Sequence, residues 1–180
     1  VAGATPVTYE DELDSEPPAP PARFRIPGLA VRDAKADGSR FPLVIVAHCY
    51  DNVPIAISWL TENLASKGYV VAAIRHEDTY LNPAGFPQAA LRRPLDIAFV
   101  ARELQGSLGQ SGEVDPTRTA LIGYSMGGYG VLAGDGATRD PAGGLVSGVP
   151  GGLLHPLARR GPLSAALVAP AVMAGVPMAP

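Results

Sequence analysis

The chain has 180 residues, 47% of them apolar, and a formal net charge of −3. This length allows one domain with a buried core and is too short for us to expect two. The mildly acidic charge, with scattered lysines and arginines, excludes a basic nucleic-acid-binding surface. The single cysteine, Cys49, excludes an internal disulfide framework and a four-cysteine metal site.

No stretch of about 18 apolar residues runs without an interrupting proline or charge, so we expect no membrane span. The chain begins at Val1, and no signal-peptide pattern is visible. The sequence therefore indicates a soluble protein, and it assigns neither a compartment nor an oligomeric state.

The first 22 residues combine an acidic run with a proline cluster. Five carboxylates lie between Glu10 and Glu16, and prolines follow from Pro17 to Pro21. Repulsion between like charges and the missing backbone donors of proline disfavour packed structure. We therefore predict an irregular lead-in over residues 1–22 and a folded domain over residues 23–180, with an edge strand near its start at 23–33.

From residue 43 onward, short apolar runs alternate with amphipathic segments. The runs at 43–47, 69–74 and 119–122 are typical of strands that are buried on both faces of a parallel sheet. Between them, the apolar spacing predicts one helix that follows Pro54 and stops at Lys67-Gly68, and another over residues 97–104. Strands that alternate with helices predict a three-layer α/β fold with a mostly parallel sheet, whose last strand lies near residues 172–178.

Gly123-Tyr124-Ser125-Met126-Gly127 fits the pattern G-x-S-x-G between a predicted strand and a predicted helix. In a nucleophile elbow, the serine lies on a strained turn that projects its Oγ above the sheet. The turn is so tight that side chains two residues before and after the serine would clash with it, which is why glycines occupy these positions. The helix that begins at Met126 would add backbone N–H groups and a positive dipole end. We therefore predict that Ser125 is a catalytic nucleophile; the alternative interpretation is a glycine-rich turn.

The stretch from Phe41 to Leu132 resembles the α/β-hydrolases of the dienelactone hydrolase and platelet-activating-factor acetylhydrolase branch, and it is similar to the cutinase-like polyester hydrolases. The resemblance covers about half of the chain. It rests on residues 41–48, 59–71 and 93–97, and on Asp115-Pro116 followed by the elbow. It implies a serine carboxylesterase without a cofactor or metal, acting through an acyl-enzyme on a small-molecule or polymeric ester.

The resemblance also implies an oxyanion hole formed by two backbone N–H groups. By position, Tyr50 would supply the first, from the loop after the strand that ends at Ala47, and Met126 the second. Cys49 stands where these families normally have glycine, and we interpret it as a buried, inert thiol. We interpret His48 as a residue that braces this loop.

Three further polar residues have simpler interpretations. His76, after the second predicted strand, could line the cleft. A lone histidine in a loop is more often on the surface, so we interpret His76 as a surface residue and keep the cleft as the alternative. We expect Arg93 and Asp96 to make structural hydrogen bonds at the start of a helix.

A serine hydroxyl needs a base, which in this fold follows the serine as an acid and then a histidine. After Ser125, the only acids are Asp135 and Asp140, and the only histidine is His155. At ~1.5 Å per helical residue, Asp135 would lie about 13 Å or more from Ser125. We therefore leave the triad acid and base unassigned, and we expect them to lie outside this chain.

Beyond residue 134 the chain has few charges and many prolines and glycines. We predict an insertion or cap over residues 135–167, and a fold that is truncated after the strand that follows the nucleophile helix, with an exposed sheet edge that invites partners or aggregation. A catalytically incomplete fragment or pseudo-enzyme that binds a ligand or a partner is therefore one alternative to an esterase. An acyltransferase that uses the same serine is another.

Overall fold

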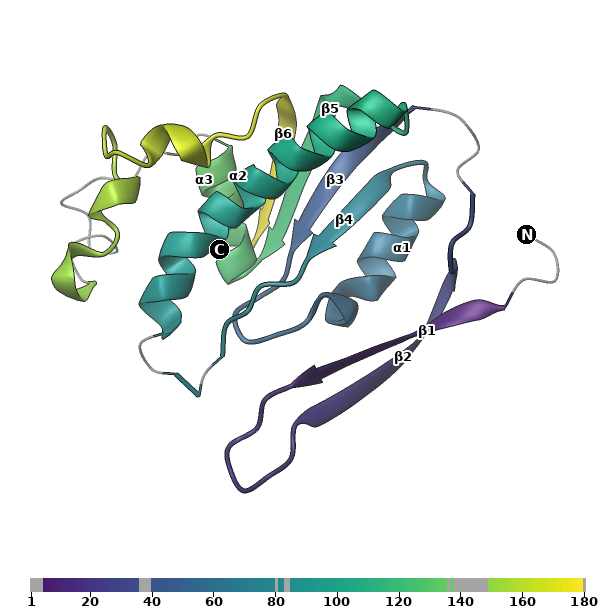
Figure 1. The fold of residues 1–180 in the computed structure, drawn as a ribbon, viewed down its shortest axis with the longest axis horizontal. Coiled ribbons are helices and arrows are strands. Elements are labelled where there is room, and N and C mark those ends of the chain that lie inside the picture. Colours follow the sequence, from purple (N-terminus) through teal and green to yellow (C-terminus); the bar gives the residue numbers. More distant parts are fainter. Residues whose placement is uncertain are drawn as a thin grey trace.

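The computed structural model describes residues 5–35, 40–79, 81–82, 85–135, 137 and 149–179. A four-stranded sheet forms the centre of the molecule (Figure 1), with the order β4-β3-β5-β6, and every neighbouring pair in it is parallel. Its strands are β3 (Phe41–Ala47), β4 (Val70–Ile74), β5 (Val114–Tyr124) and β6 (Val172–Met178). The predicted parallel α/β fold is confirmed.

Helices cover both faces of this sheet. The odd-numbered residues of β3, from Leu43 to Ala47, are buried in one core with α2 (Gly85–Ser111) and α3 (Met126–Gly134). Val44 and Val46 are also buried, and they point to the opposite face because strand side chains alternate. Figure 1 shows α1 (Ser58–Ser66) on that side of the sheet and α2 and α3 on the other. The predicted three layers are therefore present.

Helix α2 begins at Gly85, before the predicted helix start near Arg93 and Asp96, and it continues through Pro94. Proline lacks an N–H, so it leaves the carbonyl of Ala90 without its helical donor. The hydroxyl of Tyr129, from α3, donates to that carbonyl at 3.1 Å. This tertiary hydrogen bond explains why the helix is not interrupted where the local sequence predicts a loop.

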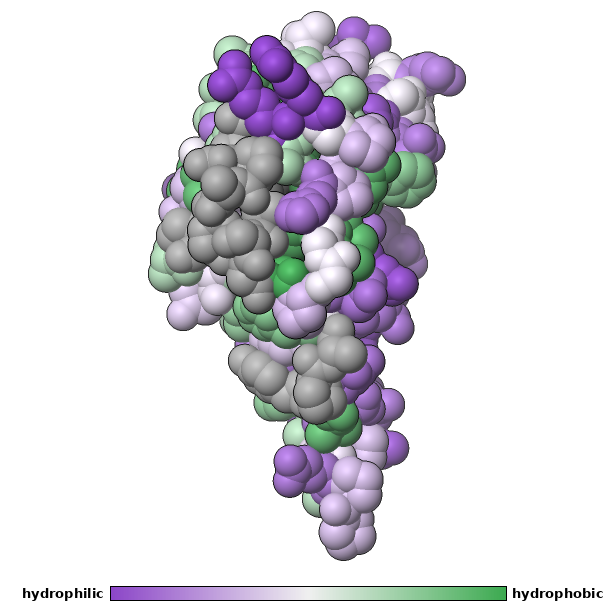
Figure 2. All heavy atoms as spheres, turned by 90° about the vertical axis from the view of Figure 1, so that its left-hand side faces the viewer, coloured by the Kyte–Doolittle hydropathy of each residue, from purple (hydrophilic) through white to green (hydrophobic). Residues whose placement is uncertain are grey.

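The prediction that residues 1–22 are irregular is wrong for Pro6–Leu13, which form strand β1. This strand pairs antiparallel with β2 (Ala22–Val31) in a separate two-stranded sheet. The predicted strand at 23–33 is therefore present as β2, although it does not lie at the edge of the central sheet. The hairpin projects below the body of the molecule, where its visible surface is largely hydrophilic (Figure 2).

The acidic run forms a strand because arginines of the neighbouring strand face it. Glu10 lies opposite Arg25, and Glu12 lies opposite Arg23. Their side chains form ion pairs of 2.9 Å and 3.5 Å. Cross-strand pairs of opposite charge stabilise a sheet, so they offset the repulsion within the run.

The predicted insertion at 135–167 falls partly outside the described residues. From residue 149 onward it contains three short 3-10 helices, and this segment packs on α2 through Leu154, Leu157 and Leu167. They are η2 (Pro150–Gly152), η3 (His155–Leu157) and η4 (Ser164–Leu167); a fourth, η1 (Pro54–Ile57), precedes α1. Among the described helices, none has the length and apolarity to cross a membrane.

Candidate functional site

Ser125 lies on a sharp turn between β5 and α3. Its backbone has φ 54° and ψ −117°, which is a strained conformation for a residue with a side chain. Two hydrogen bonds hold the turn: the Ser125 N–H donates to the carbonyl of Met178 at 2.8 Å, and the Tyr129 N–H donates to the carbonyl of Ser125 at 3.0 Å. The predicted strand–turn–helix context of this serine is confirmed.

Both glycines of the motif lie where a side chain would not fit. A Cβ atom at Gly123 would overlap the backbone of Gly127, and one at Gly127 would overlap the carbonyl of Ala47 at the end of β3. The same Cβ at Gly127 would lie 2.9 Å from the carbonyl oxygen of His48. The first turn of α3 therefore packs directly on the loop that follows β3.

That loop carries Tyr50 to the side of the elbow. Tyr50 is buried in one cluster with Ala89 and with Met126, the residue that follows Ser125. Its hydroxyl donates to the carbonyl of Thr79 at 2.9 Å, and its ring meets that of Phe86 edge-to-face at 5.3 Å between centroids. The structure thus brings together Tyr50, Met126 and Ser125, which the sequence placed in one site.

Cys49 occupies its place in the loop without backbone strain. The left-handed residue of this loop is Asp51, with φ 49°, and Cys49 itself lies outside the left-handed region. The thiol is half-buried, so its interpretation as a buried thiol is wrong, and it accepts a hydrogen bond from Asn52 Nδ2 at 3.1 Å. A side chain is therefore tolerated at position 49, since the positive φ falls two residues later.

His48 braces the loop, as predicted. Its Nε2 accepts the backbone N–H of His76 at 3.0 Å, so Nδ1 carries the proton and donates to the carbonyl of Cys49 at 2.7 Å. Burial removes the hydration of a charged ring and lowers the pKa of His48 to about 4, and nearby Arg93 acts in the same direction. His48 is therefore neutral at physiological pH.

His76 is buried, so its interpretation as a surface residue is wrong. Its ring packs edge-to-face on His48 at 5.3 Å, and its Nδ1 lies 3.4 Å from Asp96 Oδ2. Its Nε2 has no hydrogen-bond partner within the described part of the chain.

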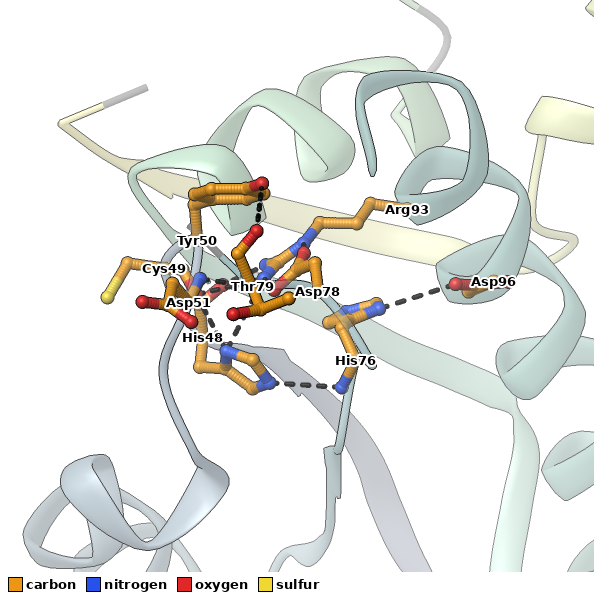
Figure 3. A network of polar contacts seen from close by, with 9 residues as sticks. All are labelled: His48, Cys49, Tyr50, Asp51, His76, Asp78, Thr79, Arg93 and Asp96. Atoms are coloured by element: carbon orange, nitrogen blue, oxygen red, sulfur yellow. Dashed lines mark hydrogen bonds and ion pairs between the residues drawn. The ribbon is translucent and has the colours of Figure 1, made fainter. Parts of the chain in front are cut away.

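Arg93 was expected at the start of a helix but lies inside α2, where it is fully buried. Its guanidinium points toward the loop residues (Figure 3). Its partner Asp78 follows β4, and this ion pair was not predicted from the sequence. A signal was present: Arg93 lies four and eight residues before Ile97 and Ala101, so it extends the apolar face of the helix. A charge on a buried face indicates a buried partner.

No base or acid is assigned to Ser125. His155 is exposed in η3, Asp135 caps the far end of α3, and Asp140 lies outside the described residues. Across the residues that the structure describes, no histidine or carboxylate hydrogen-bonds to the Ser125 hydroxyl, and no cluster of three metal-ligating side chains is present.

Two hollows lie near these elements. A cleft of about 550 Å³ is lined by Thr79 and Ala89, which contact Tyr50, and by the polar side chains of His76, Asp78 and Arg93. A larger groove of about 750 Å³ separates the hairpin from α1 and contains the exposed Trp59. The groove is lined by α1, which lies on the opposite face of the sheet from α3. The smaller cleft borders the loop of Tyr50, and its lining includes neither Ser125 nor Met126.

A protein-family model described as PET hydrolase-like matches residues 32–142, which is more than half of the chain. The chain belongs to the PET hydrolase-like family. This family places the chain among the α/β-hydrolases, as the resemblance predicted, and supports the similarity to polyester hydrolases; the dienelactone hydrolase branch stays a prediction.

Individual relatives are more distant. The cutinase est1 of Thermobifida alba is 29% identical over 96 residues, which are 53% of this chain and 31% of that protein. Cutinase 2 of Thermobifida cellulosilytica is 28% identical, over 53% of this chain and 35% of that protein. The chain therefore spans about a third of the length of the cutinases that it matches.

Solved esterases are also similar in structure, although weakly. Esterase 2 of Thermogutta terrifontis has a TM-score of 0.40 at 17% identity, over 57% of this chain and 38% of that one. A bacterial heroin esterase has a TM-score of 0.39 at 16% identity, over 70% of this chain and 38% of that one.

Proposed function

We propose that Ser125 is the nucleophile of a carboxylic ester hydrolase that acts through an acyl-enzyme. The observation that supports this most directly is the strained backbone of Ser125, with φ 54°, on the turn between a buried strand and a helix. Strain of this kind persists only where the surrounding structure maintains it, and it concentrates at functional sites. Membership of the PET hydrolase-like family points to the same chemistry.

In the proposed reaction, Ser125 Oγ attacks the carbonyl carbon of the ester and transfers its proton to a base that is not yet assigned. The carbonyl π electrons move to oxygen, and the backbone N–H groups of Tyr50 and Met126 stabilise that oxyanion. Collapse of this intermediate releases the alcohol, which takes the proton. Water then attacks the acyl-enzyme by the same route and releases the carboxylic acid.

The proposed substrate is an ester of a carboxylic acid, either a small molecule or a polymer. The relatives at 28–29% identity are named as cutinases, and the family is described as PET hydrolase-like. The buried ring of Tyr50, together with the Met126 side chain, offers an apolar wall for the acyl group next to Ser125.

A second candidate function is ligand binding without turnover. It is favoured by one observation: within the described ranges, no imidazole is hydrogen-bonded to Ser125. An elbow without a base would retain its shape and its oxyanion donors but would have no group to accept the serine proton.

The test is covalent labelling of the chain with a fluorophosphonate, with the modified residue identified by peptide mass mapping. We expect labelling at Ser125 in the wild type and none in Ser125→Ala, together with p-nitrophenyl acetate turnover that is lost in the same variant. Turnover that is equal in both proteins, or labelling that avoids Ser125, would contradict the hydrolase and leave the binding function.

A further inference from the structure

The guanidinium of Arg93 lies under the loop that carries Tyr50 and donates to it twice. Its Nη1 donates to the carbonyl of His48, and its Nη2 donates to the carbonyl of Cys49 at 2.9 Å. The arginine is 1% exposed, and arginine does not lose its charge in proteins. A buried positive charge must find acceptors, so the loop has to turn these carbonyls toward α2.

Asp78 holds the other side of the same loop. It faces Arg93 with both oxygens, at 2.7 Å from Nε and 3.0 Å from Nη2. Its Oδ1 also accepts the backbone N–H of Asp51 at 3.1 Å. The ion pair therefore fixes the residues on both sides of Tyr50 (Figure 3).

The hydrogen bonds to the Cys49 carbonyl also determine the direction of the Tyr50 N–H. The carbonyl of Cys49 and the N–H of Tyr50 belong to one planar peptide unit, in which a trans bond directs them to opposite sides. Arg93 Nη2 and His48 Nδ1 both hold that carbonyl, at 2.9 Å and 2.7 Å. The direction of the Tyr50 N–H is thereby fixed as well, pointing away from Arg93.

We propose that Arg93 and Asp78 are positioning residues, which orient the backbone N–H of Tyr50 as an oxyanion donor to substrate bound at Ser125. The inference rests on the proposed hydrolase function. Neither side chain touches the reacting atoms; both act through the backbone of residues 48–51.

The chain offers a native probe of this loop and a matched control. Cys49 is the only cysteine, it is half-buried, and its own carbonyl is one of the acceptors of Arg93. Arg102 also lies on α2 and donates to two backbone carbonyls, that of Ala166 in η4 at 3.1 Å and that of Val168 directly after η4 at 3.4 Å. Because Arg102 contacts a different segment, its substitution shows how the loss of an arginine from α2 affects the protein when the loop of Tyr50 is left intact.

The experiment compares Arg93→Lys, Asp78→Asn and the control Arg102→Lys in the full chain. Two rates are measured, that of Cys49 alkylation by iodoacetamide and that of Ser125 labelling by a fluorophosphonate. The midpoint of thermal unfolding is measured by circular dichroism. In folded Arg93→Lys or Asp78→Asn, we expect Cys49 alkylation to rise about tenfold, because the loop opens locally. We expect Ser125 labelling to fall about 100-fold, as when one oxyanion donor is lost. Both rates should stay at wild-type values in Arg102→Lys.

Folded Arg93→Lys or Asp78→Asn protein with wild-type rates at both Cys49 and Ser125 overturns the proposal. So does faster Cys49 alkylation with unchanged labelling of Ser125, since the loop would then move without effect on the site. If Arg93→Lys fails to fold, the proposal is tested with Asp78→Asn alone, because asparagine has nearly the same shape as aspartate. If Ser125 is never labelled, even in the wild type, the proposed hydrolase fails, whereas the Cys49 rates still report whether the ion pair holds the loop.

Discussion

Backbone strain at Ser125 depends on close contacts that only glycine permits. The turn brings the first residues of α3 against the carbonyl of Ala47, and Gly127 lies at that contact. The spacing of the motif follows from this packing: residues 123 and 127 both meet backbone, and backbone cannot rotate away as a side chain could.

Gly127→Ala is expected to destabilise the protein, because its Cβ would overlap the Ala47 carbonyl. The expected loss of unfolding free energy is about 1–3 kcal/mol, typical of overpacking. The matched control is Gly106→Ala on α2, where a Cβ meets no atom within 4 Å. Removing a glycine from a helix interior should stabilise by about 0.5–1 kcal/mol. Chemical denaturation measures both, and a Gly127→Ala protein at least as stable as the wild type would contradict this packing.

The neutral state of His48 predicts a pH dependence of stability. The pKa of His48 is about 4 in the folded protein, against 6.5 for an ordinary histidine. Below pH 6.5 the unfolded chain takes up a proton that the folded protein excludes, so unfolding becomes easier as the pH falls toward 4. The contribution of neutral His48 to the free energy of unfolding is fully present above pH 6.5. Since one pKa unit corresponds to about 1.36 kcal/mol, the loss of this contribution at low pH amounts to at most about 3 kcal/mol.

Urea unfolding at a series of pH values between 4 and 7 measures this dependence. In His48→Gln, the slope over this interval should be reduced, since glutamine does not titrate. An identical slope in the two proteins would show that other groups cause the acid sensitivity.

One carboxylate of α1 makes three of the hydrogen bonds that attach the hairpin of β1 and β2 to the body, and Arg75, which follows β4, adds an ion pair with Asp11. Glu62 Oε1 accepts hydrogen bonds from the Tyr9 hydroxyl at 2.9 Å and from the N–H groups of Leu29 and Ala30 at 2.7 Å and 2.9 Å. Partial burial acts to raise the pKa of Glu62, but these three hydrogen bonds outweigh it and lower the pKa below the ordinary value. The docked hairpin therefore requires Glu62 in its charged form.

Glu62→Gln should loosen this attachment, because hydrogen bonds to a neutral oxygen are weaker than those to a carboxylate. We expect a loss of about 1 kcal/mol in docking and faster tryptic cleavage at Arg23 and Arg25. The control is Glu103→Gln on α2, whose side chain is exposed. Equal cleavage of both variants and the wild type would show that the hairpin is held by other contacts.

Elements with an unbroken apolar pattern could be predicted from the sequence, and those with conflicting local signals could not. The apolar runs predicted β3, β4 and part of β5, and the segment at 172–178 predicted β6. The start of α2 was missed because Pro94 is locally a helix breaker and its compensation by Tyr129 lies 35 positions away in the chain. Strand β1 was missed because its acidic residues find their arginines only across the hairpin.

At the scale of the whole molecule, the site is assembled at one edge of a parallel sheet. The carboxyl ends of β3, β4 and β5 lead respectively to the Tyr50 loop, to Asp78 and to Ser125. Parallel strands bring their carboxyl ends to the same edge, which is why residues far apart in sequence meet there. The chain spans about a third of the length of the cutinases that it matches, so the activity of the whole site is a proposal.

The sequence by itself determined the elbow and the parallel sheet, because both depend on local information: glycines at fixed positions beside a serine, and apolar runs of strand length. Only the tertiary structure decided which residues hold the loop of Tyr50 in place. Arg93 reaches loop carbonyls that lie 44 and 45 positions away, and Asp78 lies 15 positions from it. A buried charge finds such partners through the packing of α2 on the sheet, and no spacing along the chain encodes their distance.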